Sequence, residues 1–407
     1  MPSRRRDPAA TYDRFRRAIA DEPTPLAFVD IGAFDRNADL LLRPVQKAGK
    51  TLRVASKSIR CVDLMRRFID RSAGTARGVM TYSAREVAFL AGHGFDDLLL
   101  AYPVATRIDA ARIAKTVSSG ATVAVAIDSI EHIDLLDAAA AEHNVRIRVV
   151  IDVDLSLRPV GENLHLGVRR SPLHRADDVI RVAELAARRA HLEVVGVLAY
   201  EAHIAGVTDA NPFTTTTNAA KGLLRRVSKR PVFEERAAIV RAFERASLPL
   251  TLFNGGGTGS IEWSSSDPSL TEVTAGSGLL ASHLFDYFKE SQIEPAAFFA
   301  LTVTRLPAPG FATCHSGGFV ASGEIGVDRL PVPTLPAGLA LTQLEGAGEV
   351  QTPLLVPEGV SLRVGDPVFF RHAKAGELSE HFNEYLLIDQ DTIVGRAQTY
   401  RGMGQRF

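Results

Sequence analysis

A lysine directly after a strongly apolar segment is the first candidate for chemistry in this chain. Lys57 follows residues 52–56, Leu-Arg-Val-Ala-Ser, which have the composition of a strand. If that strand belongs to a barrel of alternating strands and helices, its carboxyl end opens on the active-site mouth. A lysine amine that loses its charge by desolvation there can attack an aldehyde. A solvated lysine just beyond a strand would look the same, so the surrounding motifs must decide.

A glycine-rich segment after another apolar strand is the second candidate. Residues 254–260 read Asn-Gly-Gly-Gly-Thr-Gly-Ser and follow the strand candidate 250–253. Glycines let backbone amides approach an anion, and hydroxyl groups add donors, so the segment is typical of a phosphate site. It lacks the ending of a nucleotide-binding P-loop and the spacing of the dinucleotide motif, which favours a smaller phosphate. A tight glycine turn without a ligand is the competing interpretation.

The elements that must position these residues follow from hydrophobic patterning. From Pro25 to about residue 278, short aliphatic runs alternate with longer helical patterns, as in a parallel sheet built of strand–helix units. The candidate strands are 26–29, 52–56, 77–81, 97–101, 122–127, 146–152, 192–199, 250–253 and 271–275. These are nine, and a closed barrel needs eight. Without the first, the segment 254–260 and the turn 275–278 follow strands seven and eight, the loops that often form the phosphate site.

Local signals place the helices between these strands. Ser83 and Glu86 have the spacing of a capping box, and Gly92 is a plausible stop for the helix that follows. The segment 212–248 predicts two helices broken near Pro231, because proline disrupts a helix interior.

The character of the chain changes after about residue 285. Proline and glycine become frequent, and the runs between them read as short strands without a helical period. We therefore expect a barrel over residues 25–285 and a β-rich domain over 286–407, joined by residues 1–24. The amino-terminal stretch contributes apolar residues at helical spacing, namely Tyr12, Phe15 and Ile19.

Composition narrows the class of protein. The chain has 407 residues, of which 46% are hydrophobic, and its 47 basic residues balance 47 acidic ones, so neither a nucleic acid nor an anionic membrane is an expected partner. Cys61 and Cys314 are too few for a disulfide framework, which suits a reducing cytoplasm. Residues 1–6 are basic without an apolar run behind them, and no run is long enough for a membrane span. We expect a cytoplasmic protein.

A reactive lysine opposite a phosphate site leaves two interpretations, a pyridoxal-phosphate enzyme or a Schiff-base aldolase for sugar phosphates. The chain resembles the D-threonine aldolase and D-serine dehydratase family of the alanine-racemase-like (fold type III) pyridoxal-phosphate enzymes, and within it the actinobacterial amino acid deaminase/aldolase proteins. The blocks that carry this resemblance, in the family's order, are Thr24-Pro25 to Asn37, Arg53 to Ser58, Leu98 to Pro103, Ala199 to His203, Gly255 to Gly259 and Glu272 to Ser277.

The resemblance implies a (β/α)8 TIM-like barrel with a C-terminal β domain, in which the first strand, 26–29, joins the β domain. It implies pyridoxal 5'-phosphate bound to Lys57 as a Schiff base, and a lyase for β-hydroxy D-amino acids acting by retro-aldol cleavage or dehydration and deamination. It also implies a homodimer in which one chain's β domain covers its partner's barrel. The cofactor contacts expected are Lys57, Tyr200, His203, Arg158, Asn254, Gly255, Gly256, Gly257, Thr258, Gly259, Gly276 and Ser277.

Two departures from the family pattern concern the ring nitrogen and the metal. Family members show Arg-x-Gly-Val where this chain has His165-Leu-Gly-Val, so Arg158 is only one candidate for the ring-nitrogen partner. Members of this family bind a divalent cation through His-x-Cys or His-x-Asp, whereas this chain has His372-Ala-Lys374. Because one cation cannot ligate another, we expect no metal there and assign His372 and Lys374 to catalysis. A competing interpretation makes Glu380 and His381 metal ligands; both also fit a solvated face.

Two other functions stay open at this point. An amino-acid racemase would need a second base on the opposite face of the cofactor, and neither Tyr385 nor Tyr400 has a context that matches such a role. A non-catalytic pyridoxal-phosphate-binding protein would need only the barrel, and the long β domain argues against it. The sequence does not reveal the natural amino-acid substrate or choose between aldol cleavage and elimination.

Overall fold

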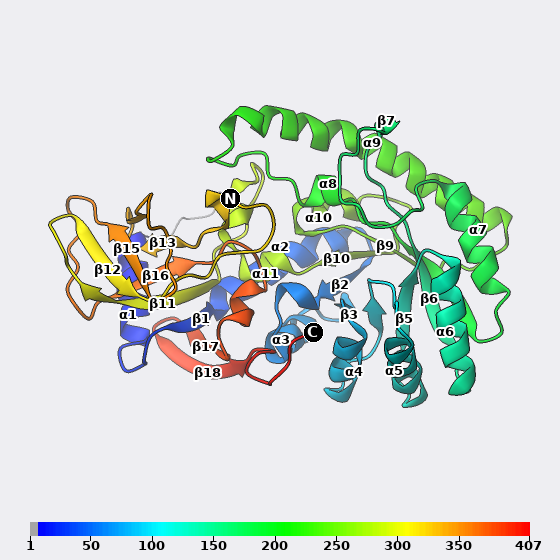
Figure 1. Ribbon diagram of the computed structural model, residues 1–407, viewed down its shortest axis with the longest axis horizontal. Coiled ribbons are helices and arrows are strands. Elements are labelled where there is room, and N and C mark those ends of the chain that lie inside the picture. Colours follow the sequence, from blue (N-terminus) through cyan, green and yellow to red (C-terminus); the bar gives the residue numbers. More distant parts are fainter. Residues whose placement is uncertain (1–6) are drawn as a thin grey trace.

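Eight parallel strands close into a barrel in the computed structural model, which describes residues 7–407 (Figure 1). The prediction made for residues 1–6 lies outside the described residues. In barrel order the strands are β10 (Glu272–Ala275), β2 (Thr51–Ala55), β3 (Ala76–Thr81), β4 (Leu98–Leu100), β5 (Val123–Ile127), β6 (Ile147–Asp152), β8 (Leu192–Leu198) and β9 (Leu252–Gly255). The predicted fold class is confirmed.

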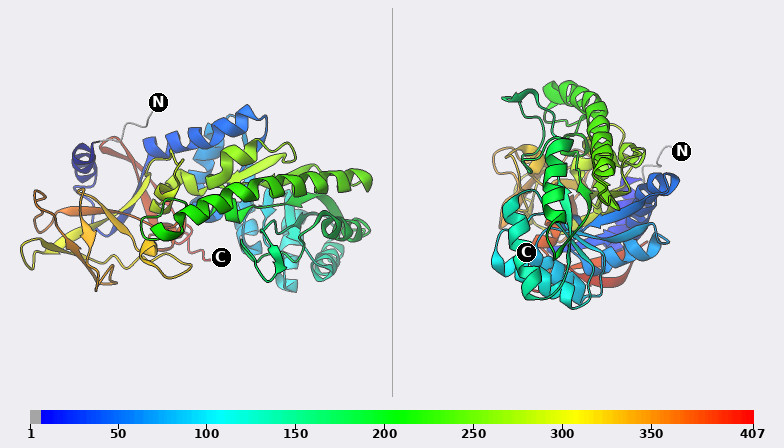
Figure 2. Two further views of the ribbon diagram at one scale, coloured as in Figure 1. Left: turned by 90° about the horizontal axis from the view of Figure 1, so that it is seen from above. Right: turned by 90° about the vertical axis from the view of Figure 1, so that its right-hand side faces the viewer.

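Helices cover the outside of the barrel, and those that connect two neighbouring parallel strands bury an apolar stripe against them (Figures 1 and 2). They are α3 (Val62–Arg71), α4 (Ala84–Gly92), α5 (Arg107–Ser118), α6 (Ile130–Glu142), α7 (Ala176–Ala187), α8 (Ala202–Ala205), α9 (Thr215–Arg245), α10 (Ile261–Ser265) and α11 (Ser277–Leu280). The Ser83 hydroxyl accepts from Glu86 N–H at 3.1 Å, as the capping motif predicts, and α4 ends at Gly92. Glu86 itself accepts from Tyr82 N–H at 2.8 Å.

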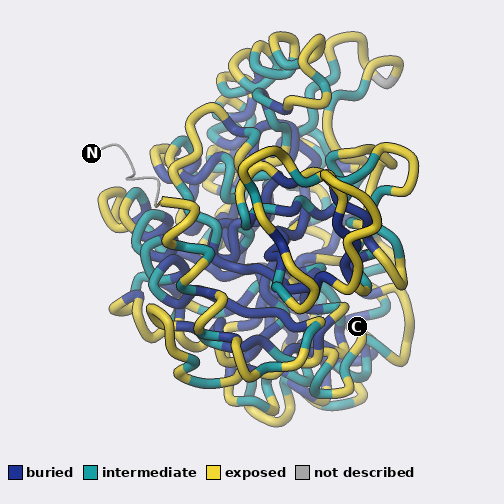
Figure 3. Tube along the Cα trace, turned by 90° about the vertical axis from the view of Figure 1, so that its left-hand side faces the viewer, coloured by how far each residue is buried: buried dark blue, intermediate teal, exposed yellow. Residues whose placement is uncertain are grey.

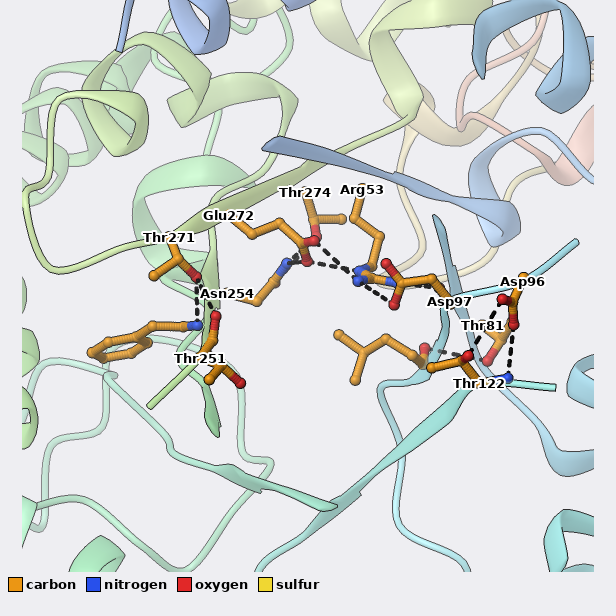
Figure 4. A network of polar contacts seen from close by, with 12 residues as sticks. Arg53, Thr81, Asp96, Asp97, Thr122, Thr251, Asn254, Thr271, Glu272 and Thr274 are labelled. Atoms are coloured by element: carbon orange, nitrogen blue, oxygen red, sulfur yellow. Dashed lines mark hydrogen bonds and ion pairs between the residues drawn. The ribbon is translucent and has the colours of Figure 1, made fainter. Parts of the chain in front are cut away.

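A buried ion pair fills part of the barrel interior (Figure 4). Arg53 donates two hydrogen bonds to Glu272, at 2.6 and 3.0 Å, and Asn254 donates to the same carboxylate at 2.6 Å. Arg53 also donates to Asp97 at 3.0 Å. Gly78, at φ +64, lies against the Arg53 guanidinium, where a side chain would overlap it. The network ties β10, β9 and β2 together below the carboxyl ends that carry the candidate residues.

A nine-stranded sheet forms a second body beside the barrel (Figure 1). The strand predicted first, now β1 (Leu26–Asp30), lies in this sheet and not in the barrel, between β11 (Ala297–Arg305) and β17 (Glu384–Asp389). Its helix α2 (Ile31–Lys47) then leads into β2. The remaining strands are β12 (Phe311–His315), β13 (Val332–Leu335), β14 (Ala340–Leu341), β15 (Gln351–Leu355), β16 (Pro367–Arg371) and β18 (Thr392–Gln398).

The amino-terminal helix α1 (Pro8–Ala18) packs on this sheet. Phe15 is 1% exposed and its ring lies 4.7 Å from that of Phe28 and 5.6 Å from that of Phe369. Figure 3 shows buried chain in the interior and exposed chain on the surrounding loops. No helix within residues 7–407 is long and apolar enough to cross a membrane.

The predicted break near Pro231 is wrong, because α9 runs without interruption through it (Figure 2). Tertiary contacts hold the segment after the proline. Phe233 stacks on Trp263 with ring centroids 4.6 Å apart, and the buried Arg236 pairs with Asp267 at 3.1 Å. Packing of this kind outweighs the hydrogen bond that proline removes from a helix.

Candidate active site

A cavity of about 540 Å³ opens at the carboxyl ends of the barrel strands. The barrel contributes Lys57, the glycine-rich segment and the turn after β10, and residues 322–323, 328–329 and 374–375 of the β-rich part close the other side. Sequence positions more than 300 residues apart therefore meet in one hollow. The predicted residues that line it are Lys57, Tyr200, Asn254, Gly256, Gly257, Thr258, Gly276, Ser277 and Lys374.

Lys57 lies in a single 3-10 turn, Ser56–Ser58, directly after β2. Its ammonium nitrogen is 5.8 Å from the centre of the Tyr102 ring, which also lines the cavity. Behind the turn, Gly376 at φ +78 presses so close to the Lys57 carbonyl that a side chain would overlap it. The lysine is thus presented to the cavity by a turn that both parts of the chain contact.

The glycine-rich segment forms a cradle beside Lys57. Gly256 adopts φ +86, a conformation that favours glycine, and a Cβ on Gly257 would lie 2.9 Å from Ala205 Cβ. A Cβ on Gly276 would lie 2.8 Å from Ala55 O. Gly255 and Gly259 do not line the cavity, but a side chain at either would overlap Arg236 or the Ala205 carbonyl.

Hydroxyl groups on the cradle face the same hollow. Thr258 Oγ1 accepts from Gly278 N–H at 3.0 Å and keeps its own proton for a ligand, and Ser277 Oγ lies 2.9 Å from Ser58 Oγ. Asn254 lines the cavity, but its amide donates to Glu272 and Thr274, so it supports the strand ends. Small residues, hydroxyl donors and a facing lysine fit the phosphate and aldehyde groups of pyridoxal phosphate.

Glu201, a residue that sequence reasoning missed, orders the cradle from behind. Its carboxylate accepts from Gly256 N–H at 3.0 Å and from Ser260 Oγ at 2.7 Å, and it pairs with Arg236. Burial alone would raise the pKa of Glu201, but the Arg236 charge and the serine hydrogen bonds hold it below its usual value. The signal in the sequence was a lone carboxylate inside the apolar block 199–203.

Tyr200 lines the cavity, but two other predicted contacts do not. Burial raises the pKa of the Tyr200 hydroxyl, which therefore stays protonated at neutral pH. His203 and Arg158 line a separate cavity of about 230 Å³, where Arg158 donates to Asp154 at 2.9 Å. His203 turns away because α8 begins between it and Tyr200 and directs its buried side chain into this second cavity. Neither residue faces Lys57, which corrects both expectations.

Arg170 takes the place in the cavity that was considered for Arg158. Its Nε donates to Asp152 at 3.0 Å and its NH2 group donates to Ala101 O at 3.2 Å. Its guanidinium carbon lies 5.9 Å from the Tyr102 ring centre, so Lys57 and Arg170 flank one aromatic ring. Burial raises the pKa of Asp152 to about 7, against the lowering effect of Arg170. Arg170 lies two residues after the segment His165 to Val168, which was compared with the family pattern.

The β-rich part supplies Lys374 and not His372. The Lys374 ammonium donates to Ser322 Oγ at 3.1 Å, and both residues line the cavity. His372 is 3% exposed, lies outside the cavity lining, and has a pKa lowered to about 3 by burial and by Arg371. It is therefore neutral, and the catalytic role expected for it is not supported by its position.

The residues present do not fit a divalent cation. Lys374 offers a positive charge where the resemblance implies a ligand. Glu380 pairs with Arg60 at 2.5 Å, and the exposed His381 packs against Phe319 with ring centroids 4.7 Å apart and the rings tilted by 33°. Within residues 7–407 no group of three or more His, Cys, Asp or Glu side chains is placed to hold a metal. Glu380 and His381 both lie outside the cavity lining.

The chain is similar in sequence to a family model and to known enzymes. The family model for the alanine racemase N-terminal domain matches residues 29–281. The 3-hydroxy-D-aspartate aldolase of Paracoccus denitrificans (strain Pd 1222) is 24% identical over 254 residues, or 62% of this chain and 59% of that protein. The chain thus spans about three-fifths of the length of the curated relatives it matches.

Solved structures match over nearly the whole chain. D-threonine aldolase from Filomicrobium marinum superposes with a TM-score of 0.80 at 18% identity, covering 94% of this chain and 96% of that one. D-threo-3-hydroxyaspartate dehydratase from Delftia sp. HT23 gives a TM-score of 0.72 at 19% identity, covering 94% and 98%. Both likenesses show the fold, a barrel with an attached β-rich part.

Proposed function

The chain belongs to the alanine racemase N-terminal domain family, and we propose that it is a pyridoxal-phosphate-dependent lyase for β-hydroxy D-amino acids, acting by retro-aldol cleavage or by dehydration and deamination. The observation that carries the proposal is one cavity that combines Lys57, a glycine cradle and Lys374. The relatives named above, two aldolases and a dehydratase, support the reaction class.

Each wall of the cavity has a distinct task in this proposal. Bound pyridoxal phosphate supplies an electron sink for carbanion charge. Lys57 holds the cofactor and moves a proton at the substrate's α-carbon once its amine is free. Thr258 and Ser277 hold the phosphate with the cradle, and Arg170, fixed by Asp152, is our candidate for the ring nitrogen.

Lys374 acts at the substrate's β-oxygen. Its ammonium is fixed by Ser322, which in turn donates to Glu377, so the charge is held at the cavity wall. A fixed cation stabilises a developing alkoxide, and the same group can return a proton to a leaving hydroxyl. The step needs no metal ion, in keeping with the donor set of this site.

Racemisation is the weaker candidate because the two β-domain tyrosines are committed elsewhere. Tyr385 Oη lies 2.8 Å from Ser379 Oγ, and Tyr400 Oη donates to Glu86 at 2.9 Å. Both are at most 1% exposed, so neither reaches the cavity of its own chain or of a partner.

We also propose a cytoplasmic homodimer in which residues 25–285, apart from their first strand, form the barrel domain, and residues 286–407 with that strand and the amino-terminal segment form the β domain. The resemblance supports the dimer, and the two buried thiols, Cys61 and Cys314, suit a reducing compartment. Size-exclusion chromatography with light scattering checks the dimer.

A product screen tests the function. The purified protein with pyridoxal phosphate is incubated with D-threonine, D-allothreonine, D-serine and D-3-hydroxyaspartate, with the L-forms as controls, and glycine, aldehydes, oxo acids and ammonia are quantified. We expect glycine with an aldehyde, or an oxo acid with ammonia, from D-forms only. Interconversion of D- and L-forms without cleavage would establish the racemase instead.

A further inference from the structure

The C-terminal segment 399–407 follows β18 and ends beside α3 (Figure 1), and it contacts the turn after Lys57. Tyr400 N–H donates to Arg60 O at 2.8 Å, and Thr399 forms an isolated bridge with Cys61. Arg60 itself adopts φ +50, a left-handed conformation that costs free energy in a residue with a side chain. The turn that presents Lys57 therefore depends on contacts from outside it, and this segment provides two of them.

Tyr400 also reaches a buried carboxyl group behind the lysine. Its hydroxyl donates to Glu86 Oε1 at 2.9 Å, and Tyr82 N–H donates to Glu86 Oε2 at 2.8 Å. Ser56, the residue before Lys57, lies against the same carboxyl and donates to Met80 O at 2.9 Å. Glu86 is 0% exposed and forms no salt bridge within residues 7–407.

An aromatic cluster fixes the segment over this carboxyl. The Phe407 ring lies 5.3 Å from Tyr400, 5.4 Å from Phe89 and 6.4 Å from Tyr82, measured between centroids. The contacts span helix α4, the chain before it and the C-terminal segment. The segment is thus held at both ends of its path across the lysine turn.

We propose that Glu86 and Tyr400 are positioning residues, whose contact holds the C-terminal segment on the turn 56–61 and thereby sets the position of Lys57. The inference rests on the proposed function only in naming Lys57 as the cofactor lysine. Neither residue lines the cavity, so both act through the turn.

The groups around Glu86 make this contact sensitive to pH. Burial raises its pKa to about 7, while hydrogen bonds from Ser56, Tyr82 and Tyr400 and the Arg60 charge lower it. Burial therefore favours the neutral, protonated form of Glu86. We therefore expect the segment to loosen as pH rises through 7, because ionised Glu86 lacks a paired cation.

Hydrogen exchange of the apoprotein, followed by mass spectrometry, tests the contact without relying on activity. Tyr400→Phe keeps the ring and removes the hydroxyl, and should raise exchange of the amides of residues 59–61 about 2- to 10-fold at pH 6, the worth of a hydrogen bond between neutral groups. Tyr12→Phe is the matched control, because its hydroxyl donates to Pro367 O at 3.1 Å, remote from the turn. It should leave exchange at the turn unchanged.

Glu86→Gln separates positioning from simple stability. Its amide can accept from Tyr82 N–H and donate to Tyr400, as a protonated carboxyl would, so exchange at the turn, corrected for intrinsic rates, should no longer depend on pH between 6 and 8. In the loaded enzyme, Tyr400→Phe should lower kcat and spare KM. Unchanged exchange in Tyr400→Phe, or a pH dependence that persists in Glu86→Gln, would overturn the inference. Altered exchange in a protein without lyase activity would overturn the proposed function alone.

Discussion

Replacing Glu201 by glutamine should damage the phosphate cradle from behind. Both Glu201 and Arg236 are 0% exposed, and the carboxylate also accepts from Gly256 N–H. Every partner of Glu201 donates a hydrogen bond to it, so the NH2 group of a glutamine would face other hydrogen-bond donors. The change therefore leaves the buried Arg236 without the charge of its partner and places the new NH2 group beside the hydroxyl donors of Ser260 and Ser264.

The magnitude follows from the partners that remain. Breaking a buried ion pair costs about 3–5 kcal/mol, because it leaves an uncompensated charge. Arg236 keeps Asp267 at 3.1 Å, so we expect the lower end of this range, about 3 kcal/mol in the free energy of unfolding. We also expect roughly tenfold weaker cofactor binding, since a lost hydrogen bond to a charged group is worth about that factor.

Urea unfolding and fluorescence titration with pyridoxal phosphate measure the two effects. Glu234→Gln is the matched control, because Glu234 is on the exposed face of α9 and pairs with Arg230 at 2.7 Å. Exposed pairs of this kind contribute about 0.5 kcal/mol or less. A Glu201→Gln protein as stable as the control, with unchanged cofactor affinity, would refute the role given to Glu201.

Three further predictions follow from the site. Activity of the natural protein should survive exhaustive chelation, whereas Lys374→Ala should abolish activity and still bind the cofactor. Loss of activity on chelation, restored by manganese or zinc, would show that a metal site lies elsewhere in the protein. Arg170→Gln should shift the cofactor absorption band and lower kcat about 10- to 100-fold, because a charged group at the ring is lost; an unchanged spectrum would assign the ring nitrogen to another residue. Because the pKa of Glu86 rises from its ordinary 4.5 to about 7 on folding, stability should fall as pH rises from 4.5 to 7, by about 3 kcal/mol from this group. Urea unfolding at several pH values should show Glu86→Gln gaining on the natural protein over that window; parallel curves would count against the assignment.

Most of the fold was readable from the sequence because it depends on local patterns. The short aliphatic runs matched barrel strands to within a residue or two, and the Ser83 cap marked α4. The family resemblance, which the comparisons confirm, placed the first of the nine candidate strands, 26–29, in the β-rich sheet. The break expected at Pro231 is absent because tertiary contacts such as the Arg236 ion pair hold the helix after the proline.

The site was only partly readable because it depends on side-chain direction. Lys57 and the cradle directly follow barrel strands, and the carboxyl end of such a strand lies at the mouth of the barrel. His203 lies in the short helix α8 and Arg158 in the loop after β6, and both side chains point into another cavity. Arg170 and Glu201 were missed because their partners, Asp152 and Arg236, are distant in sequence or carry no motif.

Borohydride reduction followed by peptide mapping tests the central claim most directly. Reduction fixes the cofactor covalently to the amine that holds it, and two lysines, Lys57 and Lys374, line the cavity. We predict the reduced cofactor on the peptide that contains Lys57, and no bound cofactor in Lys57→Ala. Cofactor fixed to Lys374 or to any other lysine, or none fixed at all, would contradict the account.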